Sequence, residues 1–237
     1  MKKKVAVIGA NGFVGKSICD EINKSENLDL IKITRSDNIK QLIQNVDLVI
    51  HSAKSSRRYY ANNNPKEDFI DTVEKMAIIQ SHLNNRKVIL ISTISARVQL
   101  DTPYGRNRRS CELMLNDEKD LAVRLGPMFG ESNHKGALFD ILQNKKVYVG
   151  ESTKYAYTSV KYNAKKIIEL IDETGIIEIG AKNAIELGYL KKELNSSSTF
   201  HGANDTQILL TKENDAPDAF DVITFAKKIK EKSVSTL

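Results

Sequence analysis

The amino-acid sequence predicts an α/β fold: a Rossmann-like, doubly wound parallel sheet with a small C-terminal lobe. Apolar runs alternate with helix-like segments through the first half of the chain, as crossover connections between parallel strands require. The first apolar run, residues 5–8, leads directly into glycines at positions 9, 12 and 15. The length of 237 residues, 41% of them hydrophobic, suits one α/β domain with a core of its own.

The elements of the predicted core follow from this alternation. Strands are predicted at residues 5–8, 28–34, 46–51, 87–92 and 121–125, and helices at 13–24, 38–45, 66–85 and 105–117. Residues 57–60, after the third strand, are predicted to be a basic, aromatic surface loop, with an anion-binding loop over the ligand as the alternative. We expect residues 1–130 to form the dinucleotide-binding core.

The pattern loosens beyond residue 126. Helices are predicted at 134–144, 161–173 and 182–194, with short strands at 146–149 and 176–179. The segment from residue 195 is polar and serine-rich, and we expect a mostly peripheral tail with one short strand at 208–210. The chain is therefore predicted to be a single domain in which residues 131–237 are interleaved with the core.

The glycine-rich segment is typical of a turn that receives the pyrophosphate of a dinucleotide. A Cβ would block both the tight turn and the approach of the phosphates, and the helix that follows offers free N–H groups and a positive dipole end. A purely structural turn is the alternative, but the apolar run before it and the strand at 28–34 favour binding. The residues expected to hold the cofactor here are Gly9, Asn11, Gly12, Phe13, Val14 and Gly15.

Charge and cysteine content limit the class of protein. The net charge is +6, but the basic residues are spread along the chain among 30 acidic ones, so we expect no nucleic-acid partner. The two cysteines and four histidines have no metal-ligand spacing, so no metal site is predicted. Because no segment is apolar enough to span a membrane and the cysteines suggest a reducing compartment, we expect a cytoplasmic protein.

Polar side chains with catalytic potential follow the fourth strand. Ligands of an open parallel sheet bind beyond the carboxyl ends of its strands, where Thr93 and Ser95 lie. Tyr104 and Arg108 are four residues apart and share one face of the next helix. A tyrosine can act as a general acid/base when a nearby cation stabilises its phenolate. The alternative is that Thr93 only ends a strand and Tyr104 only packs at a helix start.

These motifs, in this order, resemble the short-chain dehydrogenase/reductase superfamily, on its extended or atypical side, the NAD(P)-dependent epimerase/dehydratase group. The resemblance covers about residues 3–190 and rests on residues 9–15, 47–53, 104–112, 124–130 and 157–160. It implies that Tyr104 is the acid/base, that Thr93 is its hydroxyl partner, and that Arg108 stands where the family has a ribose-binding lysine. It also implies that residues 131–237 bind substrate and that further residues line the cofactor: Ser52, Ala53, Pro127 and Met128.

Two departures from the family leave alternatives open. Arg108 has a planar, bulkier cation than the family's lysine, and the segment between Thr93 and Tyr104 is shorter than is usual in the family. Both departures leave a slow enzyme or a non-catalytic relative as alternatives.

The residues after the second strand bear on the choice of cofactor. The strand ends at Arg35 and Ser36 with no carboxylate, which favours NADP over NAD. Asp37 and Asn38 resemble the family's adenine contact.

We therefore expect an NADP-dependent reductase of a keto group on a nucleotide-activated sugar. A nucleotide-sugar epimerase and a non-catalytic NAD(P)-binding regulator or assembly partner are the alternatives. Sugar dehydratases of the family carry an acidic pair after the threonine, whereas residues 94 and 95 here are isoleucine and serine, so dehydration is disfavoured. Because the helices at 66–85 and 105–117 pair between subunits in relatives, we also expect a homodimer.

Overall fold

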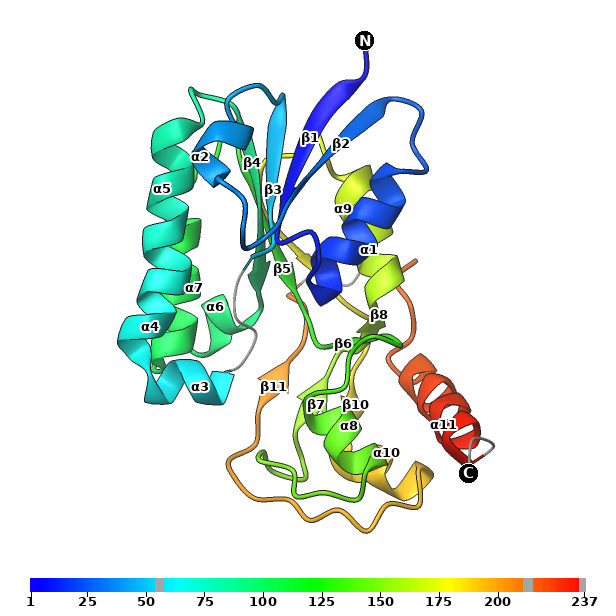
Figure 1. The fold of residues 1–237 in the computed structure, drawn as a ribbon. Coiled ribbons are helices and arrows are strands. Elements are labelled where there is room, and N and C mark those ends of the chain that lie inside the picture. The colour runs from blue at the N-terminus through cyan, green and yellow to red at the C-terminus, as the bar shows by residue number, and fades with distance from the viewer. Residues whose placement is uncertain (54–57, 211–214, 235–237) are drawn as a thin grey trace. The chain divides into compact units, whose positions relative to one another are not determined.

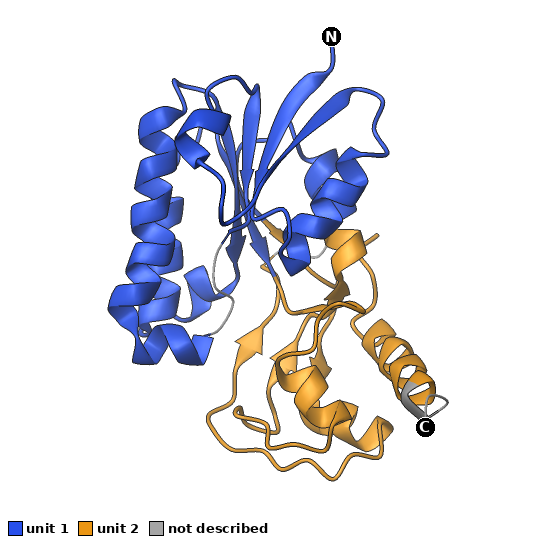
Figure 2. Cartoon of the chain, viewed as in Figure 1, with its two compact units in different colours: residues 1–125, 164–177 blue, residues 126–163, 178–237 orange. Residues whose placement is uncertain are grey.

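A computed structural model describes residues 1–53, 58–210 and 215–234 of the chain. The structure divides into two compact units (Figure 2). The first unit comprises residues 1–125 and 164–177, and the second comprises residues 126–163 and 178–237. The first unit thus ends its main segment five residues before the predicted limit of the core, and it includes a later segment that the sequence did not assign to it.

The first unit is built on a six-stranded sheet with the order β2-β1-β3-β4-β5-β9. Its strands are β1 (Lys3–Ile8), β2 (Leu28–Ile33), β3 (Leu48–His51), β4 (Lys87–Thr93), β5 (Leu121–Leu125) and β9 (Gly175–Ile179). The pairs β1–β2, β1–β3, β3–β4 and β4–β5 are all parallel. The Rossmann-like fold class predicted from the sequence is confirmed, including its first five strands.

Helices cover both faces of this sheet (Figure 1). The helical elements of this unit are α1 (Phe13–Ile22), α2 (Ile39–Leu42), α3 (Arg58–Asn63), α4 (Pro65–Phe69), the π-helical turn η1 (Ile70–Glu74), α5 (Lys75–His82), α6 (Ser95–Val98), α7 (Pro103–Glu112) and, from residue 164 on, α9 (Val160–Glu169). The segment expected as a helix at 66–85 is the continuous run α4–η1–α5. The expected surface loop is wrong for residues 58–60, which begin α3, while residue 57 lies outside the described residues.

The alternation of side chains along the strands divides the core of the first unit. Ala6 and Ile8 pack with Met76 and Ile79 of α5 in one apolar cluster. Val5 and Val7 are also fully buried, and they point to the opposite face because successive residues of a strand alternate. A sheet that is buried on both faces in this way needs nearly continuous apolar strands, as observed.

The second unit contains small sheets and helices. A three-stranded sheet has the order β10-β7-β11, formed by β7 (Lys154–Tyr155), β10 (Ile185–Glu186) and β11 (Thr206–Gln207). A parallel pair joins β6 (Met128–Phe129) to β8 (Thr158–Ser159). The helices of this unit are α8 (Ala137–Leu142), α10 (Leu187–Glu193) and α11 (Asp221–Val234).

The prediction of a peripheral tail is wrong. Helix α11 is the longest helix of this segment, and its residues Val222 and Ala226 are fully buried in the core of the second unit. Phe225 packs on Phe129 with ring centroids 4.9 Å apart. The lysines of α11 give this segment a polar composition, so its buried apolar residues were not recognised in the sequence.

Other predicted elements of the second unit differ in their bounds. Residues 146–149 form no strand beyond an isolated bridge between Val147 and Phe200. The strand expected at 208–210 lies at Thr206–Gln207, and the helix expected from residue 182 begins at Leu187 because β10 precedes it. The serine-rich stretch instead covers the end of α8, where the Ser196 hydroxyl donates to the Ile141 carbonyl at 2.6 Å.

Candidate active site

The glycine turn between β1 and α1 has the geometry that a dinucleotide requires. Gly9 has a φ of 86°, in the left-handed region that favours glycine. A Cβ on Gly9 would lie 2.8 Å from the backbone of Ala53, and a Cβ on Gly15 would lie 2.1 Å from the Gly9 carbonyl oxygen. Ser52 holds the turn from the side of β3, because its amide and hydroxyl both donate to the Ile8 carbonyl at 2.9 Å.

The open side of this turn fits an anion. Asn11 and Gly12 are exposed, and Gly12 is the N-cap of α1. Within the described residues, no side chain caps the first amides of α1, and its first turn carries no acidic residue. Free amides at the positive end of a ten-residue helix, beside a turn that excludes side chains, suit the pyrophosphate of a dinucleotide.

The loop after β2 places the predicted ribose-binding residues next to this turn. The amides of Gly9 and Ala10 both donate to the Ile33 carbonyl, so the end of β2 lies beside the glycines. Arg35 and Ser36 are exposed on this loop. Cofactor contacts by these two residues remain predictions.

Asp37 and Asn38 are engaged in the loop itself. The Asp37 carboxylate accepts hydrogen bonds at 2.7 Å from both the hydroxyl and the amide of Thr34, and these bonds hold the pKa of Asp37 below its ordinary value. The Asn38 side chain accepts from the Gln41 amide and caps α2. The adenine contact expected of both residues remains a prediction, and their observed partners are within the loop.

Thr93 and Tyr104 lie on successive elements of the first unit. Thr93 is the last residue of β4 and is partly exposed, and its Oγ1 accepts from the Ser95 amide at 3.3 Å. Tyr104 lies in the first turn of α7 and is buried, and its amide donates to Asn62 Oδ1 of α3 at 3.2 Å. A Cβ on Gly105 would lie 2.0 Å from the Gln99 carbonyl oxygen, so the start of α7 packs directly on the segment after β4.

Arg108 is buried against Tyr104. Its guanidinium carbon lies 4.3 Å from the centroid of the Tyr104 ring, a cation–π distance, so the predicted shared helix face is observed. The same guanidinium forms an ion pair with Asp68 of α4, with Nη2–Oδ1 and Nη1–Oδ2 distances of 3.1 and 3.3 Å. Asp68 was not anticipated, because a lone aspartate in a polar helical segment carries no signal of its partner 40 residues away.

A second buried cluster anchors the far end of α7. Glu112 accepts hydrogen bonds from Ser92 of β4 at 2.6 Å, from Arg124 of β5 at 2.9 and 2.7 Å, and from Arg109 at 3.0 Å. Burial alone would raise the pKa of Glu112, but the hydrogen bonds from Arg124, Ser92 and Arg109 outweigh it and lower that pKa. This cluster was also missed from the sequence.

The remaining predicted residues, Pro127 and Met128, belong to the second unit. The Pro127 carbonyl accepts from the Thr158 amide at 3.1 Å, and Met128 is paired with Thr158. Their place beside a cofactor remains a prediction. Among the residues that the structure describes, no group of three or more His, Cys, Asp or Glu could hold a metal ion, and no helix could span a membrane.

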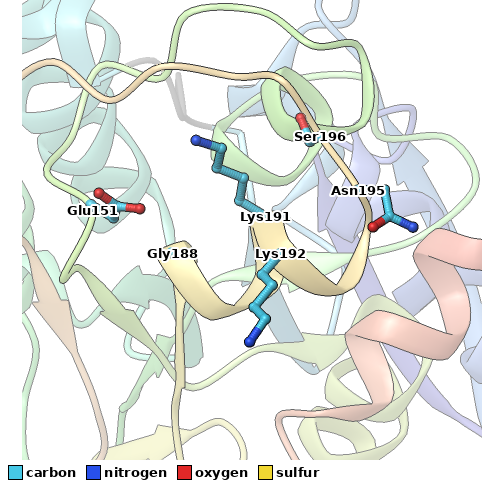
Figure 3. Close-up of a pocket in the computed structure, with 6 residues that line it drawn as sticks. All are labelled: Glu151, Gly188, Lys191, Lys192, Asn195 and Ser196. Carbon is cyan, nitrogen blue, oxygen red and sulfur yellow. The ribbon is translucent and has the colours of Figure 1, made fainter.

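A surface hollow of about 460 Å³ lies in the second unit, lined by Glu151, Gly188, Lys191, Lys192, Asn195 and Ser196 (Figure 3). The side chains of Lys191 and Lys192 point in different directions, so their charges do not converge on one point. None of the predicted site residues lines this hollow.

Comparison with known proteins places the fold. No family model matches the chain. It is 32% identical over 114 residues to the UDP-2-acetamido-2,6-beta-L-arabino-hexul-4-ose reductase of Pseudomonas aeruginosa, a match that covers 46% of this chain and 30% of that relative. The chain thus spans less than a third of the curated relative that it matches.

Solved structures match along nearly the whole chain. An NAD-dependent NDP-hexosamine 5,6-dehydratase of tunicamycin biosynthesis superposes with a TM-score of 0.81 at 12% identity, covering 98% of both chains. The UDP-N-acetylglucosamine 4-epimerase of Methanobrevibacter ruminantium M1 has a TM-score of 0.75 at 19% identity, covering 100% of both. The chain has the fold of the extended short-chain dehydrogenases. The fold that the resemblance implies is therefore confirmed.

This fold is shared by proteins with either nicotinamide cofactor. The dTDP-4-dehydrorhamnose reductase of Bacillus anthracis, solved with NADP, has a TM-score of 0.75 at 16% identity and covers 97% of this chain and 99% of that one. Solved proteins with this fold thus include one described as NAD-dependent and one solved with NADP, and the fold does not favour either form.

Proposed function

We propose that the chain is an NADP-dependent reductase that converts a keto group on a nucleotide-activated sugar to an alcohol. The observation that carries this proposal is Tyr104, held in the first turn of α7 with the Arg108 guanidinium 4.3 Å from its ring. The partial match to a UDP-sugar reductase supports reduction over epimerisation.

The residues of the first unit divide the work of the reaction. The turn at Gly9, Gly12 and Gly15 binds the pyrophosphate of the cofactor. NADPH, when bound, supplies the hydride that adds to the keto carbon. The Tyr104 hydroxyl donates the proton that the carbonyl oxygen then needs, and the Thr93 hydroxyl holds that oxygen by a hydrogen bond.

The preference for NADP rests on Arg35. An arginine after the second strand suits a 2′-phosphate, whereas NAD-binding proteins place a carboxylate there. Asp37, the nearest carboxylate on this loop, is bound by Thr34, which leaves the exposed Arg35 side chain to meet the phosphate.

Substitution of Tyr104 tests the reaction. Tyr104→Phe keeps the ring that Arg108 covers and removes only the hydroxyl, so we expect NADPH oxidation with a 4-keto sugar nucleotide to fall at least about a hundredfold. Tyr59→Phe, at an exposed tyrosine of α3, is the matched control and keeps full activity. Equal rates for the two variants would contradict the proposal. A tightly held NAD that interconverts two sugar epimers without net oxidation would identify an epimerase instead.

Substitution of Arg35 tests the cofactor. In fluorescence titrations we expect Arg35→Ala to weaken NADPH binding at least about tenfold and to leave NADH binding unchanged. Lys24→Ala, which removes an exposed cation at the other end of α1, should change neither affinity. Equal affinity of the unchanged chain for NADPH and NADH would contradict the NADP preference.

We also propose a cytoplasmic homodimer. Apolar side chains are exposed on α4, on η1 and at the end of α7, where they could pair between subunits: Phe69, Ile70, Leu113 and Met114. The cytoplasmic location rests on the sequence, in which the two cysteines, Cys19 and Cys111, form no disulfide framework. Sedimentation equilibrium of the chain and of Leu113→Asp tests the dimer: the variant should be monomeric.

A further inference from the structure

Arg108 is held by a partner that completes its geometry. Arg108 and Asp68 are each only 1% exposed, and two hydrogen bonds join the two terminal nitrogens of the guanidinium to the two oxygens of the carboxylate. A single point cation such as lysine could not make this bidentate contact. The carboxylate therefore fixes the plane of the guanidinium as well as neutralising its charge.

Asp68 lies where the α-helical geometry of its helix changes to a π-helical turn. Asp68 lies one residue before the end of α4, and the next residues form the π-helical turn η1 instead of continuing as an α-helix. The Thr72 hydroxyl donates to the Asp68 carbonyl within this turn, and Asn107 Nδ2 donates to Asp68 Oδ2 at 2.9 Å from α7. Short π-helical turns are frequent at functional sites, because they turn a side chain out of the regular helical pattern.

The contact between Arg108 and Tyr104 transmits this constraint to the reacting group. A guanidinium 4.3 Å from a ring centroid lies against the face of the ring. When Asp68 fixes the guanidinium plane, it also limits the orientation of the Tyr104 ring and thus the direction of its hydroxyl. The sequence motifs that indicate Tyr104 and Arg108 do not include Asp68.

We propose that Asp68 is a positioning residue, which holds the Arg108 guanidinium against Tyr104 and thereby orients the tyrosine for proton donation. This proposal rests on the proposed reductase function. In this proposal the ion pair of Asp68 and Arg108 acts as one unit, at the position where the family that the sequence resembles has a single lysine. A buried ion pair with only a structural role would stabilise the fold but leave the turnover of folded protein unchanged.

Asp68→Asn, Arg108→Lys and the double variant separate these two roles. In folded protein we expect each single variant to lower kcat about tenfold or more, because a small misplacement of a catalytic group is costly, while KM and the Kd for NADPH stay within about twofold. The double variant should have about the same kcat as the poorer single variant, because residues that act as a unit are not additive. Asp71→Asn, an exposed carboxylate three residues further along, is the matched control and keeps full activity.

Several results would overturn the proposal. A single variant with kcat within about twofold of the unchanged chain, or losses that multiply in the double variant, would contradict it. If Asp68→Asn does not fold, the kcat of Arg108→Lys tests the proposal by itself, since this variant retains the positive charge and loses only the bidentate contact with the carboxylate. If Tyr104→Phe is inactive while Asp68→Asn keeps its kcat, the positioning role fails and the reductase stands. If the unchanged chain reduces no nucleotide sugar, both proposals fail.

Discussion

Asp68 and Glu112 are two buried carboxylates that join α7 to different parts of the first unit. Asp68 comes from a neighbouring helix and holds Arg108, which covers Tyr104. Glu112 lies at the end of α7 and holds Arg124 of β5 and Ser92 of β4. One carboxylate therefore connects helix to helix around a reacting side chain, and the other connects helix to sheet.

The difference shows how one helix can be anchored to the sheet at one end and have a buried tyrosine positioned at the other. Glu112 accepts from two arginines and a serine, so its loss would release the helix from the carboxyl ends of two strands. Asp68 accepts from one arginine and from the neutral Asn107. We expect changes at Glu112 to appear mainly in stability, and changes around Asp68 to appear mainly in turnover.

Removal of the Glu112 carboxylate has the largest expected effect on stability. Glu112→Gln breaks a buried, multiply hydrogen-bonded ion pair, and we expect a loss of about 3–5 kcal/mol in the free energy of unfolding. Urea denaturation at pH 7 measures this loss, with Glu118→Gln, an exposed carboxylate nearby, as the control. A loss no larger than that of the control would remove the distinction between the two ends of α7.

Acid should weaken the same cluster without a mutation. The pKa of Glu112 is lowered in the folded state, so its contribution to stability is present above the unfolded pKa of about 4.3 and is lost as pH falls through the folded pKa. We expect the stability difference between the unchanged chain and Glu112→Gln to be constant from pH 8 to about pH 5 and to shrink below that. A difference that stays constant down to pH 3 would contradict this.

Ser92 provides a smaller test of the helix-to-sheet connection. Ser92→Ala removes a 2.6 Å hydrogen bond to a charged acceptor that keeps its two arginine partners, and we expect a loss of about 2 kcal/mol. Ser110→Ala, whose hydroxyl bonds only a carbonyl within α7, is the control for urea denaturation. Because Ser92 precedes Thr93, unchanged kcat in this variant would show that the cluster acts on the fold alone.

Asn107, which contacts Asp68, is expected to have the smallest effect on stability of the residues tested. Asn107→Ala removes one neutral donor from Asp68 and leaves the arginine pair in place, so we expect a loss of about 1 kcal/mol. The kcat should fall less than in Asp68→Asn, because the guanidinium keeps both of its bonds. A larger loss of kcat than in Asp68→Asn would reverse the ranking of the two Asp68 partners.

Much of the first unit could be predicted because its signals are local. A buried parallel strand is a continuous apolar run, and the glycine spacing within residues 9–15 predicts the tight turn that is observed. The second unit offers two-residue strands, which are too short to show a period of two. Helix α11 was missed for a different reason, because its lysines gave the segment the composition of a solvated tail.

The candidate site was predictable only in part. Tyr104 and Arg108 could be paired because a spacing of four fixes their helical neighbourhood. Asp68 and Glu112 could not be assigned partners, since pairing across 40 or 12 residues is set by tertiary packing that no local pattern encodes. Their burial also runs against the usual expectation that acidic residues of polar helices are solvated.

The π-helical turn η1 has a consequence for how this helix could change by insertion or deletion. Each residue of an α-helix adds a rotation of about 100°, so deleting one residue between Asp68 and Met76 would turn the two out of register by about that angle. Met76 is fully buried in the apolar cluster that includes Ala6 and Ile8 of β1, and Asp68 forms an ion pair with Arg108. The wider π-helical turn sets the rotation between these two residues, so that Met76 lies in the core while Asp68 pairs with Arg108.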